Sequence, residues 1–210
     1  MNKDLLKLYL VTDRRLTGGR PLEDIVTQAV KGGVSLVQLR EKDLDTREFI
    51  CLAQRLKQAL APLHVPLLIN DRVDVALAAD ADGVHIGQSD MPYPMARRLL
   101  GPDKIIGLSV ENFAQIEEAN RLDVDYIGIS PVFATPTKTD TARPFGLDGL
   151  RKAVAMSVHP TVAIGGMNAS TAASVMACGT DGLAVVSAIV AADDPQQAAR
   201  HLRNILDLEQ

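Results

Sequence analysis

Residues 67–90, LLINDRVDVALAADADGVHIGQSD, contain two short apolar runs that each stop beside an aspartate. The first run ends at Asn70 and Asp71, and the second is followed shortly by Asp90. A segment with the spacing of a helix lies between them. Strands that are apolar on both faces and separated by helices are typical of a parallel sheet covered by helices. The stretch therefore predicts strand, helix and strand, with the polar ends of both strands at one edge of the sheet.

The same alternation continues through the chain. Runs of strand type occupy 8–11, 36–39, 67–69, 83–86, 105–108, 126–129, 161–164 and 182–186. Besides the helical segment that begins near Val73, segments with helical spacing occupy 22–30, 49–60, 91–100, 113–122, 147–156, 170–178 and 195–206. Eight strand and helix units predict an α/β fold, the TIM (β/α)8 barrel, in which residues 1–210 form a single domain. A doubly wound open sheet is the alternative, although no Gly-x-Gly-x-x-Gly turn follows the first run.

Composition narrows the function classes. The 210 residues are 47% hydrophobic and 23% charged, and the formal net charge is −4. At this charge we expect no nucleic-acid partner, and no apolar stretch approaches the roughly 18 residues of a membrane span. The stretch 1–7 lacks the apolar region of a secretory signal, so we expect a cytoplasmic protein. Cys51 and Cys178 lie in separate helical segments, and we expect both to be small buried side chains.

Polar side chains follow most of the predicted strands. In a barrel of this type the carboxyl ends of the strands form one rim, where active sites lie. The rim residues are Arg40, Glu41, Lys42, Asn70, Asp71, Arg72, Gln88, Asp90, Ser109 and Ser130. Asp71 and Asp90 are hard oxygen ligands of the kind that Mg²⁺ binds together with waters and phosphate oxygens. The alternative is that each aspartate caps the helix after it, and spacing alone favours neither interpretation.

Two later segments suit a phosphate group. AIGGMNAS, 163–170, places two glycines after the seventh run, and VVSAI, 185–189, puts a small residue after the eighth. Barrels of this type often hold a phosphate at that position. The backbone amides of Gly166 and Ser187 can approach an anion closely there. A tight turn without a ligand is the alternative.

The connection 130–150, SPVFATPTKTDTARPFGLDGL, is long for so economical a chain. Long loops frequently act as lids over a site. Its polar residues include Thr135, Thr137, Lys138, Thr139 and Arg143. Hydroxyls and an ammonium group suit phosphate or pyrophosphate, and a solvated polar loop is the other interpretation.

Six motifs resemble those of the thiamine-phosphate synthase family. They are YLVTDR (9–14), VQLREK (37–42), LLINDRVDVAL (67–77), ADGVHIGQSD (81–90), DYIGISPVFATPTK (125–138) and AIGGM (163–167). The motifs follow one another in order through nearly the whole chain. The resemblance implies a TIM barrel that joins a hydroxymethylpyrimidine diphosphate to a thiazole phosphate, with Mg²⁺ as cofactor, and forms thiamine phosphate and pyrophosphate.

The resemblance also implies roles for individual residues. Contacts to the pyrimidine diphosphate are implied for Gln38, Arg40, Lys42, Asn70, Ser109 and Lys138, and the catalytic candidates among them are Arg40, Lys42, Ser109 and Lys138. Asp71 and Asp90 match the magnesium ligands. Contacts to the thiazole phosphate are implied for Thr135, Thr137, Gly166, Val186 and Ser187. Leu39, Glu41 and Pro136 lie within the same motifs and complete the expected substrate-binding set.

The implied chemistry requires no nucleophilic side chain. The exocyclic CH₂–O bond of the pyrimidine breaks first, and the thiazole nitrogen captures the resulting cation. Catalysis then consists mostly of stabilising the departing pyrophosphate, and we expect His85 to be a packed barrel residue rather than a base. The alternatives are a related thiazole tautomerase, which would lack the diphosphate and metal groups, and a non-catalytic phosphate-binding barrel with a regulatory role. A homodimer is the oligomer that we expect.

Overall fold

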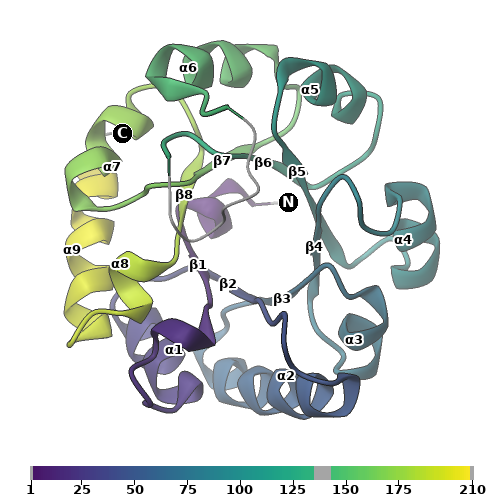
Figure 1. Cartoon of the computed structure of the whole chain (residues 1–210), viewed down its shortest axis with the longest axis vertical. Helices are drawn as coiled ribbons and strands as arrows, with labels where there is room; N and C mark the ends of the chain where they lie inside the picture. Colours follow the sequence, from purple (N-terminus) through teal and green to yellow (C-terminus); the bar gives the residue numbers. More distant parts are fainter. Residues whose placement is uncertain (1, 135–142, 209–210) are drawn as a thin grey trace.

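Eight parallel strands form a closed barrel. The computed structural model describes residues 2–134 and 143–208. The strands are β1 (Leu8–Val11), β2 (Leu36–Leu39), β3 (Leu67–Asn70), β4 (Gly83–Ile86), β5 (Ile105–Val110), β6 (Tyr126–Ile129), β7 (Thr161–Ile164) and β8 (Gly182–Val185). Each strand pairs in parallel with the next, and β8 pairs with β1 to close the ring seen in Figure 1. The TIM barrel prediction is confirmed, and the open-sheet alternative is wrong.

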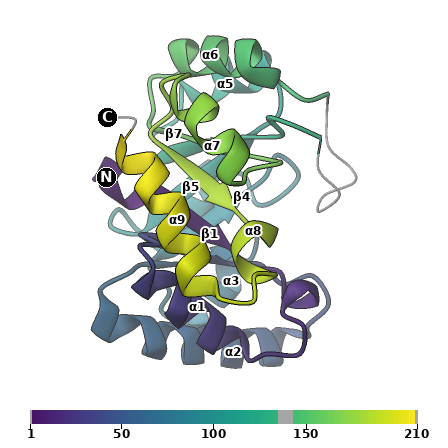
Figure 2. The same ribbon diagram turned by 90° about the vertical axis from the view of Figure 1, so that its left-hand side faces the viewer.

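Helices surround the ring on its outer side (Figure 1). The α-helices are α1 (Leu22–Lys31), α2 (Thr46–Leu60), α3 (Val73–Ala78), α4 (Tyr93–Leu100), α5 (Phe113–Ala119), α6 (Gly146–Met156), α7 (Ala169–Met176), α8 (Ser187–Val190) and α9 (Pro195–Leu208). The 3-10 helices are η1 (Lys3–Leu6), η2 (Arg14–Leu16) and η3 (Ala61–Leu63). Figure 2 shows α9 along the outside of the barrel, with α8 beside it. Within residues 2–134 and 143–208, no helix has the length and apolar character needed to cross a membrane.

Alternate residues of each strand face opposite sides of the sheet. Outward residues, such as Val37, pack against the helices in one large core. Inward residues form a smaller cluster inside the barrel, made of Leu6, Tyr9, Val11, Leu36, Leu68, Tyr126, Val162 and Ala184. The register places Gln38 beside Val11 and Asn70 beside His85. The inward residues nearest the carboxyl ends of these strands are therefore largely polar.

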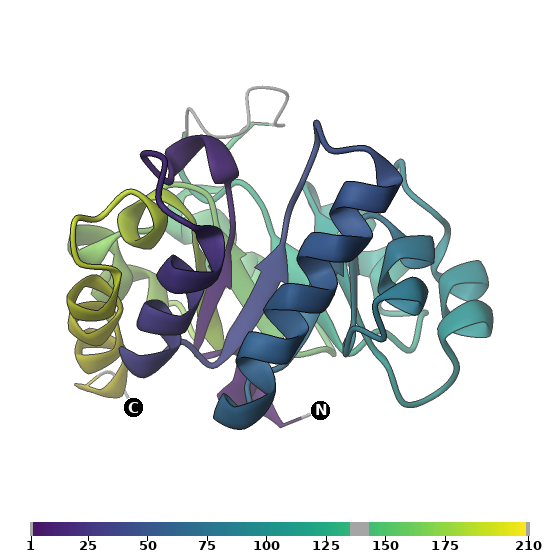
Figure 3. The ribbon, with the colours of Figure 1, turned by 90° about the horizontal axis from the view of Figure 1, so that it is seen from below.

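The opposite end of the barrel is closed. Leu6 of η1 is fully buried and belongs to the interior cluster. Lys7 is only 5% exposed, and its Nζ lies 2.6 Å from Oδ1 of Asp207 on α9. Figure 3 shows η1 at the end of the barrel away from η2 and from the connection between β2 and α2. Among the described residues, the amino end of the barrel is thus covered, and the carboxyl end is the open one.

Some element boundaries differ from the predicted ones. β5 continues to Val110, because its last residues still pair with β6. α4 begins at Tyr93 rather than at residue 91, since Pro94 is tolerated only in the first turn of a helix. The other helix ends lie within three residues of the predicted positions. Cys178 is buried, but the prediction for Cys51 is wrong, because Cys51 lies off the apolar face of α2 and is exposed.

Candidate active site at the carboxyl ends of the strands

A cavity of about 610 Å³ opens at the carboxyl ends of the strands, and all eight strands contribute to its wall. Its volume is in the range of small-molecule sites. The predicted site residues that line it are Gln38, Arg40, Lys42, Asn70, Asp71, Asp90 and Ser109. The structure thus brings together residues that follow or end four consecutive strands, from β2 to β5.

Asp71 and Asp90 lie next to each other at this rim, beside Lys42. The Nζ atom of Lys42 lies 2.5 Å from Oδ2 of Asp71. Asp90 accepts a hydrogen bond at Oδ2 from the backbone amide of Gly87, at 2.7 Å. Helices α3 and α4 both begin without a side-chain capping bond. The helix-cap interpretation is therefore wrong for both aspartates.

Asp71 has an unusual backbone conformation, and Asp90 has a raised pKa. Asp71 has a φ of 62°, in the left-handed region that few residues other than glycine adopt. Burial raises the pKa of the Asp90 carboxyl, and the neighbouring Asp71 carboxylate raises it further, while the Gly87 amide and Lys42 act in the opposite direction. Two carboxylates held this close repel each other, and a cation between them relieves the repulsion.

The donor set fits a magnesium ion. Mg²⁺ keeps several waters and is usually held by one or two carboxylates plus substrate phosphates. Among the residues that the structure describes, no group of three or more His, Cys, Asp or Glu side chains could hold a metal. Asp71 and Asp90 would hold the ion as a pair, with water and phosphate oxygens as the remaining ligands.

Two cations extend from the end of β2 into the cavity wall. Lys42 is paired with Asp71, as described above. Arg40 makes no side-chain hydrogen bond or ion pair with any described residue, while its backbone amide is fixed by Oγ1 of Thr12 at 3.0 Å. Arg15 of η2 also lines the cavity, but its Nη2 is 2.7 Å from Oδ2 of Asp43. The guanidinium of Arg40 is therefore the group most available to an incoming anion.

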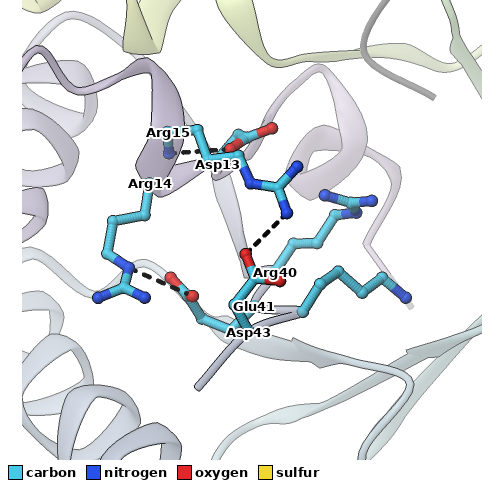
Figure 4. A pocket seen from close by; sticks show the side chains of 7 residues that line it. Asp13, Arg14, Arg15, Arg40, Glu41 and Asp43 are labelled. Atoms are coloured by element: carbon cyan, nitrogen blue, oxygen red, sulfur yellow. Dashed lines mark hydrogen bonds and ion pairs between the residues drawn. The ribbon is translucent and has the colours of Figure 1, made fainter.

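A smaller pocket of about 310 Å³ adjoins the cavity and shares Arg15, Arg40 and Lys42 with it. Figure 4 shows the side chains that line this side pocket. Glu41 lines this side pocket instead of the cavity, with its Oε2 3.4 Å from Nε of Arg14. Burial raises the pKa of Glu41, against the lowering effect of Arg14. Leu39 is fully buried and packs against the helices. The side chains of Glu41 and Leu39 are thus separated from the cavity that holds the other predicted residues.

Five side chains form a hydrogen-bonded chain across the interior of the barrel. Gln38 Nε2 donates to the Tyr9 hydroxyl at 2.6 Å, and the Tyr9 and Tyr126 hydroxyls lie 2.8 Å apart. His85 Nδ1 is 2.8 Å from the Tyr126 hydroxyl, and His85 Nε2 is 2.8 Å from Ser109 Oγ. His85 does pack inside the barrel, but it also lines the cavity. Sequence reasoning missed the two tyrosines, although their alternation with outward apolar residues was a signal that they face inward.

Asn70 presents an unsatisfied amide to this region. It ends β3 and is 8% exposed. Its Nδ2 atom is buried and has no hydrogen-bond partner within the described part of the chain. Because nearly all buried polar groups are paired, a water or a ligand oxygen would complete the hydrogen bonding of this nitrogen.

The loop after β7 approaches the neighbouring β6 loop closely. Gly166 has a φ of 73°, and a Cβ at this position would lie 2.9 Å from Cβ of Phe133. Only glycine therefore fits. Val186 precedes α8, and Ser187 is its first residue. These three predicted residues lie on the same rim but do not line the cavity, to which β7 and β8 contribute other residues.

Part of the predicted site lies outside the described residues, namely Thr135, Pro136, Thr137 and Lys138. The two described ends of this connection are held together at the rim. The Val132 amide donates to the Ile164 carbonyl at 2.9 Å, and the Phe145 amide donates to the Pro131 carbonyl at 2.9 Å. Arg143 is exposed.

Comparison with known sequences identifies close relatives. A family model described as "Thiamine monophosphate synthase" matches residues 8–189. The thiamine-phosphate synthase of Albidiferax ferrireducens is 56% identical over 202 residues, which cover 96% of this chain and 92% of that protein. The thiamine-phosphate synthase of Vibrio campbellii is 54% identical over 200 residues, which cover 95% of this chain and 98% of that protein.

Solved structures agree with the sequence comparison. The thiamine phosphate pyrophosphorylase of Pyrococcus furiosus superposes with a TM-score of 0.90 at 41% identity, over 98% of both chains. The 3-hexulose-6-phosphate synthase of Salmonella typhimurium superposes with a TM-score of 0.75 at 19% identity, over 98% of this chain and 100% of that one. The second likeness shows the barrel fold alone.

Proposed function

Since the chain belongs to the thiamine monophosphate synthase family and is a transferase of thiamine biosynthesis, we propose that it joins 4-amino-2-methyl-5-hydroxymethylpyrimidine diphosphate to a thiazole phosphate. The products are thiamine phosphate and pyrophosphate. One observation carries the proposal: Asp71 and Asp90 lie beside Lys42 and Arg40 at one end of the cavity. Anions that suit a divalent cation, next to cations that suit a polyanion, match a magnesium diphosphate.

The chain's own residues stabilise the leaving group. As the CH₂–O bond breaks, its electron pair passes to the diphosphate oxygen, so negative charge grows there. Arg40 and Lys42 neutralise this charge from fixed positions, which is more effective than solvation by water that must reorganise. Asn70 donates its unpaired Nδ2 to the same group, and Lys138 is proposed as a further cation. Magnesium, when bound by Asp71 and Asp90, supplies additional charge neutralisation.

The two organic rings occupy different parts of the rim in this proposal. Gln38 and Ser109 hold the pyrimidine on the floor of the cavity. Backbone amides at Gly166, Val186 and Ser187 hold the thiazole phosphate, with Thr135 and Thr137 as further contacts. The lone pair of the thiazole nitrogen then forms a C–N bond to the pyrimidine methylene carbon. Holding both substrates in line supplies much of the rate, because it replaces a bimolecular encounter.

Release of inorganic pyrophosphate tests the proposed function. Purified protein is given both substrates and Mg²⁺, with each substrate alone and a chelator as the control reactions. We expect one pyrophosphate for each thiamine phosphate, and only when both substrates and the metal are present. A regulatory phosphate-binding barrel would release none, and a tautomerase would convert the thiazole phosphate without the pyrimidine. Either result would refute the proposal.

We also propose that the protein acts in the cytoplasm as a homodimer. Light scattering after size-exclusion chromatography tests the oligomer, with an expected mass of twice 22.5 kDa. A mass of 22.5 kDa at micromolar concentration would contradict the dimer.

A further inference from the structure

We propose that Tyr9, Tyr126 and His85 are positioning residues that fix the direction of hydrogen bonding at Gln38 and Ser109, and so select a 4-aminopyrimidine over a 4-oxopyrimidine. The inference rests on the proposed function for the identity of the ligand. It adds a role for three side chains that touch one another inside the barrel and that the leaving-group chemistry does not use.

The chain of contacts is continuous, buried at Gln38 and the two tyrosines and half-buried at His85 and Ser109. It runs from Gln38 through the hydroxyls of Tyr9 and Tyr126 to His85 and ends at Ser109, with donor–acceptor distances between 2.6 and 2.8 Å. Both tyrosines are at most 1% exposed and Gln38 is 3% exposed. Burial raises the pKa of both tyrosines well above the usual value, so both hydroxyls keep their protons at neutral pH.

The proposed direction of this chain starts from the Gln38 amide. The Gln38 amide nitrogen can only donate, so the Tyr9 hydroxyl accepts from it and passes its own proton to Tyr126. The Tyr126 hydroxyl in turn donates to Nδ1 of His85. A neutral imidazole that accepts at Nδ1 carries its proton at Nε2, which donates to Ser109 Oγ. If the Gln38 amide were rotated to place its oxygen on Tyr9, the donor and acceptor of every hydrogen bond in the chain would exchange. The orientation of Gln38 and the hydroxyl direction of Ser109 are therefore coupled.

This direction decides what the cavity offers to a ligand. The carbonyl oxygen of Gln38 is left as an acceptor, and the hydroxyl proton of Ser109 is left as a donor. A 4-aminopyrimidine carries the complement, an exocyclic amine that donates and a ring nitrogen that accepts. A 4-oxo analogue replaces the amine with an acceptor, which would leave the buried Gln38 oxygen unpaired. Sites built to hydrogen-bond one group reject an analogue that lacks it strongly.

Two glycines make room for the chain. A Cβ on Gly107 of β5 would lie 2.1 Å from Cζ of Tyr126 and 2.3 Å from its hydroxyl oxygen. A Cβ on Gly128 of β6 would lie 3.1 Å from Cε1 of His85. The interior therefore holds these two rings in one position, as expected for residues that orient others.

A serine 2.8 Å from an imidazole nitrogen also resembles the nucleophile and base of a hydrolase. The direction of the chain argues against that role here. In the proposed direction His85 Nε2 carries a proton and donates it to Ser109, whereas a general base must accept the serine proton at that nitrogen. Ser109 is thus set to donate to a ligand.

Tyr126→Phe tests the proposal, because it cuts the chain at its centre and leaves Gln38 and Ser109 in place. The matched control is Tyr93→Phe, which also removes a bonded hydroxyl but does not line the cavity. We expect Tyr126→Phe to raise the KM for the pyrimidine diphosphate about tenfold and to leave the KM for the thiazole phosphate unchanged. Its preference for the 4-amino over the 4-oxo substrate should fall by about tenfold as well. An unchanged KM and preference would overturn the proposal.

Nitrogen-15 NMR of His85 gives a readout that does not depend on turnover. We expect the ligand-free wild type and Tyr93→Phe to show the Nε2–H tautomer, and Tyr126→Phe to show a mixture, with His85→Gln used to assign the signal. If Tyr126→Phe does not fold, Tyr9→Phe cuts the same chain one bond nearer Gln38. A wild type that releases no pyrophosphate refutes the proposed function and the ligand named here. An active wild type with the Nδ1–H tautomer refutes this inference alone.

Discussion

Gly107→Ala should destabilise the barrel from its centre. The added methyl group would lie 2.1 Å from Cζ of Tyr126, where carbon atoms normally approach no closer than about 3.5 Å. The ring is fully buried, so it must shift by more than about 1 Å in a close-packed interior. Overpacking of this kind costs about 1–3 kcal/mol, and loss of the two hydrogen bonds of the Tyr126 hydroxyl adds about 1 kcal/mol for each.

The expected loss is therefore about 3–5 kcal/mol in the free energy of unfolding, which corresponds to a decrease of roughly 6–20 °C in Tm for a chain of this size. Urea unfolding followed by circular dichroism measures it, with the midpoint falling and the m value unchanged. Gly149→Ala is the matched control, because Gly149 lies in α6 with Phe145 Cβ 3.2 Å from the added carbon. That variant should stay within about 1 kcal/mol of the wild type. If Gly107→Ala is as stable as Gly149→Ala, the account of the barrel interior is wrong.

Three further substitutions test the rim and the closed end. Asp71→Asn should raise the Mg²⁺ concentration for half-maximal rate by at least about tenfold with an unchanged circular dichroism spectrum, and an identical magnesium titration would contradict the shared ion. Lys138→Ala should lower kcat more than it raises the KM for either substrate, and a normal kcat in steady-state assays would remove its leaving-group role. The hydrogen bond with Lys7 lowers the pKa of Asp207 in the folded protein below the ordinary value of 3.8. The ion pair therefore stabilises the fold above pH 3.8, and this stabilisation is lost as the pH falls through the lower pKa of the folded state. Asp207→Asn should therefore be less stable than wild type at pH 7, with the difference shrinking below about pH 4, and a difference that is the same at both pH values would contradict the pairing.

Much of the fold could be predicted from the sequence because the strands are buried on both faces. Most therefore read as short, mainly apolar runs such as 67–69, bounded by helical spacing, and the number of runs indicates a closed barrel. The ends of elements were less predictable, because they depend on tertiary contacts. The extension of β5 to Val110 depends on pairing with β6, which a single run does not reveal.

The position of some rim residues could be predicted from the strand pattern. Parallel strands place the residues that follow them at one end, so Asp71 and Asp90 were expected to meet. Their partners could not be read from spacing, since the contact of Lys42 with Asp71 requires the β2 and β3 loops to be placed in space. The chain from Gln38 to Ser109 was also out of reach, because it depends on contacts between residues of non-adjacent strands inside the barrel.

The most direct test of the account is to locate a divalent cation in crystals grown with Mn²⁺ and pyrophosphate, because Mn²⁺ favours the same oxygen ligands as Mg²⁺ and scatters anomalously. One strong anomalous peak is expected within about 2.3 Å of a carboxylate oxygen of both Asp71 and Asp90, in contact with the pyrophosphate. A peak elsewhere, or pyrophosphate bound with Asp71 still on Lys42 and Asp90 still on the Gly87 amide and no cation between them, would contradict it.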